Sequence, residues 1–338
     1  MAESVALGDE PFEPVMTGPI SRALEHLRPF PPIPDSTGHR GAEQPTDPTS
    51  STAQAQQNGS AHVHYSNGVI DTNIPPLATV IERIHARVHA FLSESHPSGS
   101  LLASAQKQTR ISLDVVSKAL SQYKLSELSL SYNGGKDCLV LLILFLAGLH
   151  PYSQHAHTDH KTTTQTTTGP ATEEVIPSIY ALPPDPFPSV EEFVVSSAQA
   201  YHLSITKYTT SPPHTTIRTV FEDYLQRHPG IRAIFVGTRR TDPHGAKLTH
   251  FDRTDHGWPD FMRVHPVIDW HYAEIWAFIR HLDLEFCDLY RQGYTSLGGT
   301  SDTKPNPKLR RPQEDGGDGE YLPAYELTQD VEERLGRN

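Results

Sequence analysis

The residue types best able to do chemistry stand in one short turn, Ser131-Tyr132-Asn133-Gly134-Gly135-Lys136-Asp137-Cys138. A glycine pair lets the backbone approach a ligand without a Cβ in the way. The N–H groups and the positive dipole end of a following helix favour a phosphate. Lys136 adds a mobile positive charge, and Asp137 adds an oxygen ligand that suits magnesium. The turn therefore predicts a site for ATP with magnesium.

This turn matches neither of two better-known phosphate loops, G-x-x-x-x-G-K-[ST] and G-x-G-x-x-G. It resembles the turn of the adenine-nucleotide α-hydrolase-like ATP pyrophosphatases, in which a Ser-x-Gly-Gly-x-Asp sequence holds the pyrophosphate end of ATP. The alternative interpretation is a strand-to-helix turn that needs glycine only for its backbone geometry.

A second segment, residues 237–263, is rich in charged and aromatic side chains. Long loops inside a compact domain are usually functional. Arginine forks suit phosphate oxygens, and aromatic or methionine side chains suit the face of a flat heteroaromatic ring. We expect Trp258, Phe261 and Met262 to contact such a ring, with Asp255 accepting hydrogen bonds from its donors. The alternative is that Trp258 and Phe261 belong to the core and that the charges pair among themselves.

The elements that must position both loops alternate along the chain between residues 76 and 282. Hydrophobic periodicity predicts strands at 128–132, 175–181, 203–208, 231–237 and 262–267. It predicts helices at 77–92, 111–123, 137–149, 189–201, 215–227 and 272–282. This repetition implies a doubly wound, Rossmann-like α/β fold with a mostly parallel sheet flanked by helices. Because ligands on such sheets bind at the carboxyl ends of the strands, both loops are expected at one rim.

Composition divides the 338 residues into three parts. Residues 1–75 are rich in Pro, Ser, Thr, Gln and Gly and are expected to form a disordered extension, with one candidate helix at 18–28. Residues 76–310 are expected to form one α/β domain, interrupted by a low-complexity, Thr- and His-rich insertion at 154–174. Residues 311–338 form a charged C-terminal tail.

The formal net charge of −12 argues against a nucleic-acid partner, which requires a basic face. The two cysteines, Cys138 and Cys287, cannot build a disulfide framework or a four-cysteine zinc site, which fits a reducing intracellular compartment. The N-terminus has neither an apolar signal core nor an Arg-rich amphipathic stretch, and the apolar run 139–149 is too short to span a bilayer. We therefore expect a cytoplasmic protein with no membrane partner, and a monomer.

Several further motifs are similar to those of the eukaryotic FAD synthases (FMN adenylyltransferases), in particular the fungal single-domain type. In chain order they are Gly237–Pro243, Arg253–Arg263, Gly293–Gly299, Asn306–Leu309 and the C-terminal Pro323–Arg337. The resemblance covers residues 76–338 apart from the insertion. It implies that FMN and ATP are the substrates, that FAD and pyrophosphate are the products, and that Mg²⁺ is required.

The resemblance also implies which residues form the site. The ATP and pyrophosphate group consists of Ser131, Asn133, Gly134, Gly135, Lys136, Asp137, Arg239 and Arg337. The flavin group consists of Asp255, Trp258, Met262 and Arg263, and the candidate metal ligands are Asp137 and Asp242. The residues expected to be catalytic are Asn133, Lys136, Asp137, Asp242 and Arg334. Arg334 and Arg337 match two C-terminal arginines that close over the phosphates, so the tail is expected to cover the active site.

The implied reaction needs no general base, because the terminal phosphate of FMN is already an oxyanion. In-line attack on the α-phosphorus of ATP expels pyrophosphate, and catalysis consists mostly of positioning and charge neutralisation. No covalent intermediate is expected, and Cys138 is expected to be a small buried residue rather than a nucleophile.

Three alternatives remain open. A sulfonucleotide reductase shares the fold but needs a catalytic C-terminal cysteine, whereas the last cysteine here is Cys287, inside a helical pattern. A tRNA-thiolating pyrophosphatase needs further cysteines and a basic surface. A non-catalytic flavin-binding protein has no need of Lys136, Asp137 and Asp242, and a turnover assay with FMN, ATP and Mg²⁺ separates it from an enzyme.

Overall fold

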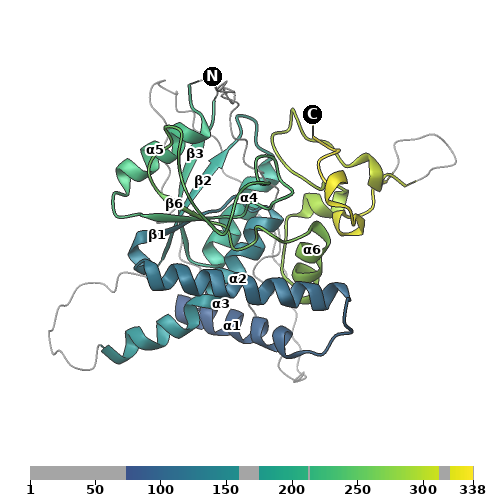
Figure 1. Cartoon of the computed structure of the whole chain (residues 1–338). Helices are drawn as coiled ribbons and strands as arrows, with labels where there is room; N and C mark the ends of the chain where they lie inside the picture. Colours follow the sequence, from purple (N-terminus) through teal and green to yellow (C-terminus); the bar gives the residue numbers. More distant parts are fainter. Residues whose placement is uncertain (1–73, 160–174, 212–213, 312–319, 338) are drawn as a thin grey trace, which may run out of the picture.

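A computed structural model of the protein describes residues 74–159, 175–211, 214–311 and 320–337 (Figure 1). The predicted N-terminal extension lies outside the described residues except for its last two positions, and the candidate helix at 18–28 lies wholly outside them. Residues 160–174 of the predicted insertion lie outside them as well. Within the described ranges, no helix is both long enough and apolar enough to cross a bilayer.

The centre of the fold is a six-stranded sheet with the order β3-β2-β1-β4-β6-β5. Its strands are β1 (Leu128–Ser131), β2 (Ile176–Leu182), β3 (Leu203–Thr209), β4 (Ala233–Val236), β5 (Phe251–Arg253) and β6 (Met262–Val264). All neighbouring strands are parallel except β5, which pairs antiparallel with β6 at the edge. The predicted mostly parallel sheet is therefore confirmed.

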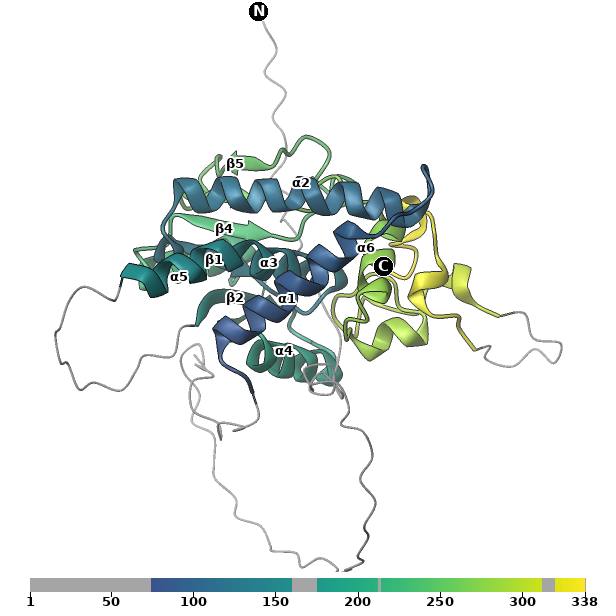
Figure 2. The same ribbon diagram turned by 90° about the horizontal axis from the view of Figure 1, so that it is seen from below.

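Helices cover both faces of this sheet. They are α1 (Leu77–Ser93), α2 (Leu101–Gln122), α3 (Lys136–Asp159), α4 (Pro188–Ala200), α5 (Ile217–Arg227) and α6 (Tyr272–His281). Among the described residues, five short 3₁₀ helices accompany them at Leu125–Glu127, Asp288–Gln292, Pro307–Leu309, Ala324–Glu326 and Asp330–Glu332. Figure 2 shows α1, α2 and α3 lying together over one face. The predicted doubly wound α/β fold is thereby confirmed.

The alternation of β1 shows how the two faces are filled. Leu128 and Leu130 are buried in the larger core, to which α1, α2, α3 and α6 contribute. Ser129 points to the opposite face, where its Oγ lies 2.7 Å from the Oη of Tyr224 on α5. The first half of helix α3 is enclosed, and every residue from Leu139 to Leu146 is fully buried, as expected for a central apolar helix.

Two helix boundaries differ from the prediction. Helix α2 begins at Leu101, ten residues before the predicted start, because Ser100 caps it by accepting a 3.2 Å hydrogen bond from the Ala103 N–H. The polar residues in the first turns of α2 interrupt the apolar periodicity, so the sequence pattern does not predict this part of the helix. Helix α3 continues to Asp159, ten residues beyond its predicted end at 149 and into the segment predicted to be an insertion. A nucleated helix gains one hydrogen bond per added residue, which carries it past the apolar run.

The sheet brings the turn at 131–138 and the start of the segment 237–263 together. Strands β1 and β4 are adjacent, with Ser131 opposite Val236, and the chain builds the sheet outward from this pair in both directions. Such a switch point leaves a crevice at the carboxyl ends of the two strands. Gly237 lies against the start of α3, where a Cβ would clash with the Cys138 backbone and Sγ. The start of the second loop therefore lies at the predicted rim. The turn between β5 and β6 leaves the sheet at the opposite end, because Met262 at the start of β6 pairs with Ala233 at the start of the parallel strand β4.

Candidate functional site

Glycine and two hydrogen bonds fix the shape of the loop between β1 and α3. Gly134 has a φ of +71°, and a Cβ there would lie about 3 Å from two side chains of α4. The Gly135 N–H donates to the Asn133 Oδ1 at 2.9 Å, and the Lys136 N–H donates to the Tyr290 Oη at 3.1 Å. Two of the loop's N–H donors are thus held by side chains of the protein itself.

Lys136 is fully buried, whereas the sequence suggested a mobile side chain. Its ammonium donates to the Asp137 Oδ2 at 3.0 Å and to the Glu333 carboxylate. The rings of Tyr272 and Tyr290 lie 5.1 and 5.9 Å from its Nζ, within range of a cation–π attraction. Burial disfavours the charged lysine, but Asp137 and Glu333 outweigh burial and raise its pKa. The side chain is therefore a fixed positive charge under the loop.

Arg239, at the carboxyl end of β4, is the second fully buried cation. Its Nε lies 2.9 Å from the Asp137 Oδ1, and its Nη2 is ion-paired with the Glu333 carboxylate. The Asp242 and Asp330 carboxylates each lie 3.4 Å from its guanidinium nitrogens. Asp242 also accepts a 2.7 Å hydrogen bond from the Arg239 N–H, so it fixes the backbone of the loop as well.

Acidic groups outnumber basic ones in this buried network. Lys136 and Arg239 face four carboxylates, those of Asp137, Asp242, Glu333 and the less buried Asp330. Burial opposes ionisation of Asp137, but Arg239 and Lys136 outweigh it and lower its pKa. Burial instead raises the pKa of Asp242 to about 6, with the charges of Asp137 and Glu333 adding to the effect. The network therefore carries an excess of negative charge.

This excess leads to a stability prediction for Asp242→Asn. The folded pKa of Asp242 is raised, so the folded protein binds this proton more tightly than the unfolded chain. The stabilisation is fully present below about pH 4 and is lost as the pH rises through about 6. Replacing the carboxylate by a neutral amide should raise the melting temperature of the ligand-free protein at pH 8 by about 2–5 °C.

Melting curves of wild type and Asp242→Asn between pH 5 and pH 8 check this, and their difference should widen as the pH rises. Asp269→Asn is the matched control, because Asp269 is a half-exposed carboxylate paired with the neighbouring Arg240 at 2.6 Å. A variant less stable than wild type at pH 8 would contradict the prediction.

The residues expected to contact the flavin lie on the hairpin formed by β5 and β6, either in its turn or on β6. Asp255 in its turn is two-thirds exposed and lies 3.4 Å from the His256 ring. Phe261 is buried and stacks on Phe221 of α5 with 5.4 Å between ring centroids, so Phe261 belongs to the core, as the alternative interpretation held. Trp258 is partly buried and lies 6.3 Å from the same Phe221 ring.

The two remaining flavin candidates stand on β6. Met262 is half-buried opposite Ala233 of β4, and Arg263 stands next to it opposite Ile234. The Arg263 guanidinium reaches the backbone oxygens of Asp252 and Arg253, each at 3.4 Å. Arg263 is thus held by backbone oxygens of β5, and the positions of Met262 and Arg263 are fixed by the pairing of β6 with β4.

The C-terminal segment lies against residues 293–306. Thr295 Oγ1 donates to the Glu333 backbone oxygen at 2.6 Å, and the Lys304 N–H donates to the Gly336 oxygen at 2.8 Å. The Arg334 Nη1 lies 3.5 Å from the Ser296 Oγ. The Arg337 Nη2 donates to Asp302 at 2.8 Å, and its guanidinium packs so closely on Gly298 that a Cβ there would clash with it.

Comparison with known proteins agrees with this geometry. The family model for the phosphoadenosine phosphosulfate reductase domain matches residues 127–305, just over half of the chain. The probable FAD synthase of Schizosaccharomyces pombe is 38% identical over 259 residues, which are 76% of this chain and 89% of that protein. The chain belongs to the FAD synthase family.

Solved structures support the same membership in the FAD synthase family. Candida glabrata FMN adenylyltransferase, in complex with FAD and inorganic pyrophosphate, is similar with a TM-score of 0.70 and 28% identity, over 79% of this chain and 99% of that one. Yeast FAD synthetase in complex with FAD gives a TM-score of 0.66 at 28% identity, over 78% of this chain and 100% of that one. The predicted family is therefore confirmed.

Sequence reasoning missed two carboxylates that this FAD synthase family member places at the rim. Glu333 stands within the C-terminal motif, and nothing in its local sequence distinguishes a buried acid from a solvated one. Asp185 follows β2 and accepts hydrogen bonds from the Ser301 N–H at 2.7 Å and the Thr300 Oγ1 at 3.1 Å. Gly299 allows this approach, since a Cβ there would clash with the Asp185 carboxylate. Its place at the carboxyl end of a parallel strand was a usable signal.

Proposed function

We propose that this protein is an FMN adenylyltransferase, which transfers the AMP moiety of ATP to FMN and releases FAD and pyrophosphate. The observation that carries the proposal is the buried group of Lys136, Arg239 and their acidic partners at the switch point of the sheet. That position, in a member of the FAD synthase family, suits the triphosphate of ATP. The Candida glabrata relative carries the product pair, FAD and pyrophosphate.

The chemistry requires the chain to hold two anions in line. The FMN phosphate is the nucleophile and attacks the α-phosphorus of ATP, while pyrophosphate leaves on the opposite side. No proton has to be removed from the nucleophile, so positioning and charge neutralisation supply the rate enhancement. In this proposal the loop Asn133–Lys136, together with Ser131 at the end of β1, binds the pyrophosphate end of ATP.

The donor set also fits a Mg²⁺ ion. The Asp137 Oδ1 is buried and has no hydrogen-bond donor in suitable geometry, although Arg239 is close to it. Asp242 contributes a second carboxylate and the network has excess negative charge. Carboxylate oxygens are the protein ligands that Mg²⁺ prefers. We propose that Asp137 and Asp242 hold the ion, which would neutralise charge on the phosphates of ATP.

Cations of the chain complete the proposed charge neutralisation. Arg239 and Lys136 lie beneath the loop, and Arg334 and Arg337 stand on the C-terminal segment. We assign Arg334 to the transition state, where negative charge crowds between the two substrates. Glu333 is a positioning residue in this scheme, because its carboxylate joins Lys136 and Arg239 to the segment that carries Arg334.

The flavin end of the site is predicted to depend on Asp255. Asp255→Ala should raise the KM for FMN at least about 10-fold and change the KM for ATP by less than about 3-fold. Loss of one hydrogen bond to a charged acceptor typically costs about 1.5–3 kcal/mol. The matched control is Asp260→Ala in the same turn, where the aspartate is also two-thirds exposed but pairs with Arg253. Equal weakening of both substrates would mean that the turn supports the whole site rather than the flavin.

Turnover tests the proposed function directly. Purified full-length protein is incubated with FMN, ATP and Mg²⁺. FAD is quantified by chromatography and pyrophosphate by a phosphate assay, and the two products should form in equal amounts. Binding of FMN without turnover would favour a non-catalytic flavin-binding protein. Sulfite release from a sulfonucleotide with a thiol reductant would favour a reductase, although both Cys138 and Cys287 are buried.

The cellular compartment and the oligomeric state of the protein are part of the same proposal. We propose that the protein acts in the cytoplasm, because its two cysteines, Cys138 and Cys287, are both buried free thiols, which suit a reducing compartment. We also propose that it acts as a monomer. Microscopy of a fluorescent fusion and light scattering of the purified protein check these two points.

A further inference from the structure

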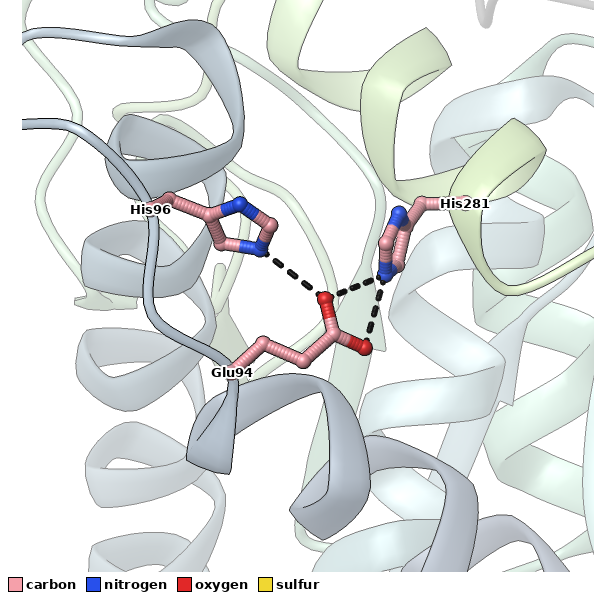
Figure 3. Close-up of side chains that lie close together, drawn as sticks. All are labelled: Glu94, His96 and His281. Carbon is pink, nitrogen blue, oxygen red and sulfur yellow. Dashed lines mark hydrogen bonds and ion pairs between the residues drawn. The ribbon is translucent and has the colours of Figure 1, made fainter.

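Two histidines and a glutamate converge at the far end of α6 (Figure 3). Glu94 directly follows α1, His96 stands two residues later, and His281 is the last residue of α6. The Glu94 Oε2 lies 2.9 Å from the His96 Nε2 and 2.7 Å from the His281 Nε2. The donor atoms of all three side chains lie within 4.8 Å of one another. Two distant parts of the chain thus present three ligand-type atoms to one point.

The surroundings hold these side chains in place. Gln106 of α2 donates from its Nε2 to the backbone oxygens of Phe91 at 2.6 Å and of Glu94 at 2.9 Å. The ring of Phe91 lies 6.3 Å from the His96 ring and 5.0 Å from the His281 ring. Supporting contacts of this kind orient metal ligands before the ion arrives. The Phe91 ring thus lies beside both imidazoles, and Gln106 ties the backbone of Glu94 to α2.

The donor set and its spacing indicate which ion fits. In a tetrahedral zinc site with bonds of about 2.0–2.1 Å, neighbouring donor atoms are about 3.3 Å apart. The observed separations of 2.7 and 2.9 Å need only a small expansion to admit an ion. Two imidazoles and one carboxylate suit zinc, whereas Mg²⁺ prefers a shell of oxygens.

We propose that Glu94, His96 and His281 form a Zn²⁺-binding site, with water as the fourth ligand. The Glu94 carboxylate and the His281 ring are partly exposed, with 39% and 28% of their side-chain surface accessible, so an ion can enter from solvent. The His96 ring is more enclosed, at 15%. Among the described residues, these three form the one group of His, Cys, Asp and Glu side chains whose donor atoms meet this closely.

The site is separate from the proposed Mg²⁺ site. At the first turn of α6, the Tyr272 N–H donates to Asp330 at 2.7 Å, and the Tyr272 ring lies beside Lys136. His281 is nine residues further along, so about 14 Å of helix separates the two ends. Zinc would therefore clamp the connection between α1 and α2 onto the end of α6 without touching the substrates. Its role would be structural.

Metal binding by the full-length protein tests the proposal. The protein is freed of metal with a chelator, exchanged into chelator-free buffer and titrated with Zn²⁺ alone in a calorimeter. Wild type should take up one tight equivalent, with a Kd below about 1 µM, and its melting temperature should rise by about 5 °C at saturating zinc. His281→Ala and Glu94→Gln should each weaken that equivalent at least about 100-fold and abolish the thermal shift.

Matched controls make the result decisive. His89→Ala removes an exposed histidine of α1 that contacts His85 instead of the proposed site, and it should bind zinc as wild type does. The metal-free melting temperature of each variant shows that it is folded. Equal zinc uptake by wild type and His281→Ala, or no tight equivalent in wild type, overturns the proposal. Because the readout is metal binding, neither outcome depends on whether the protein makes FAD.

Discussion

Asp137→Asn is expected to lower the kcat for FAD formation at least about 100-fold while the protein stays folded. The Asp137 carboxylate contacts both buried cations, Lys136 at 3.0 Å and Arg239 at 2.9 Å, and the Glu333 carboxylate also contacts both. Its Oδ1 is also the buried oxygen best placed for Mg²⁺ in the proposed site. Loss of a ligand and of a charge partner together should cost about 2.7 kcal/mol or more of transition-state stabilisation.

Steady-state kinetics at saturating ATP and FMN, with Mg²⁺ titrated to excess, measure this loss. Asp269→Asn is again the matched control, since it removes an equal charge from a half-exposed ion pair, and it should change kcat by less than about 2-fold. If excess Mg²⁺ restores the rate of Asp137→Asn to that of wild type, the residue affects only metal affinity and the proposed catalytic role is wrong.

The parts of the fold that could be predicted are those with a local signature. Three patterns each predict the structure of the residues that carry them: the apolar run 139–149, the glycine pair and the alternating strands. The structure confirms the central helix, the tight turn and the parallel sheet. Parallel topology places the loops that follow strands at one rim, so Asp137 and Arg239 were expected at the same rim. Their contact depends in addition on the adjacency of β1 and β4, which the structure shows.

The parts that could not be predicted depend on contacts between distant segments. Glu333 reaches Lys136 across 197 residues of sequence, and His281 reaches Glu94 across 187. Neither acid has neighbours in sequence that mark it as buried or as part of a cluster. The edge strand β5 was missed for a related reason, because three residues with two charges carry too little pattern to predict a strand. Roles in catalysis for individual residues stay predictions until kinetics test them.

Glu333→Gln is expected to lower kcat about 10- to 30-fold while raising the KM for ATP by less than about 3-fold. The Glu333 carboxylate joins Lys136 and Arg239 from a segment whose next residue is Arg334, so its removal should free that segment from the nucleotide loop. Breaking a buried ion pair also destabilises the fold, here by about 3 kcal/mol. Glu332→Gln is the matched control, because the neighbouring Glu332 pairs at 2.7 Å with the half-exposed Lys308 and should leave both kcat and stability nearly unchanged.

A double-mutant cycle separates positioning from a merely structural role. If Glu333 acts by holding Arg334 in place, Arg334→Ala should lower kcat about 30-fold in wild type but less than about 3-fold in the Glu333→Gln background. A structural defect elsewhere would leave the effect of Arg334→Ala unchanged, and the two losses would then multiply. Multiplicative losses at temperatures where both variants are folded would falsify the positioning role. A strong coupling would instead mean that the buried Glu333 carboxylate sets the geometry of the arginine at the reacting phosphates.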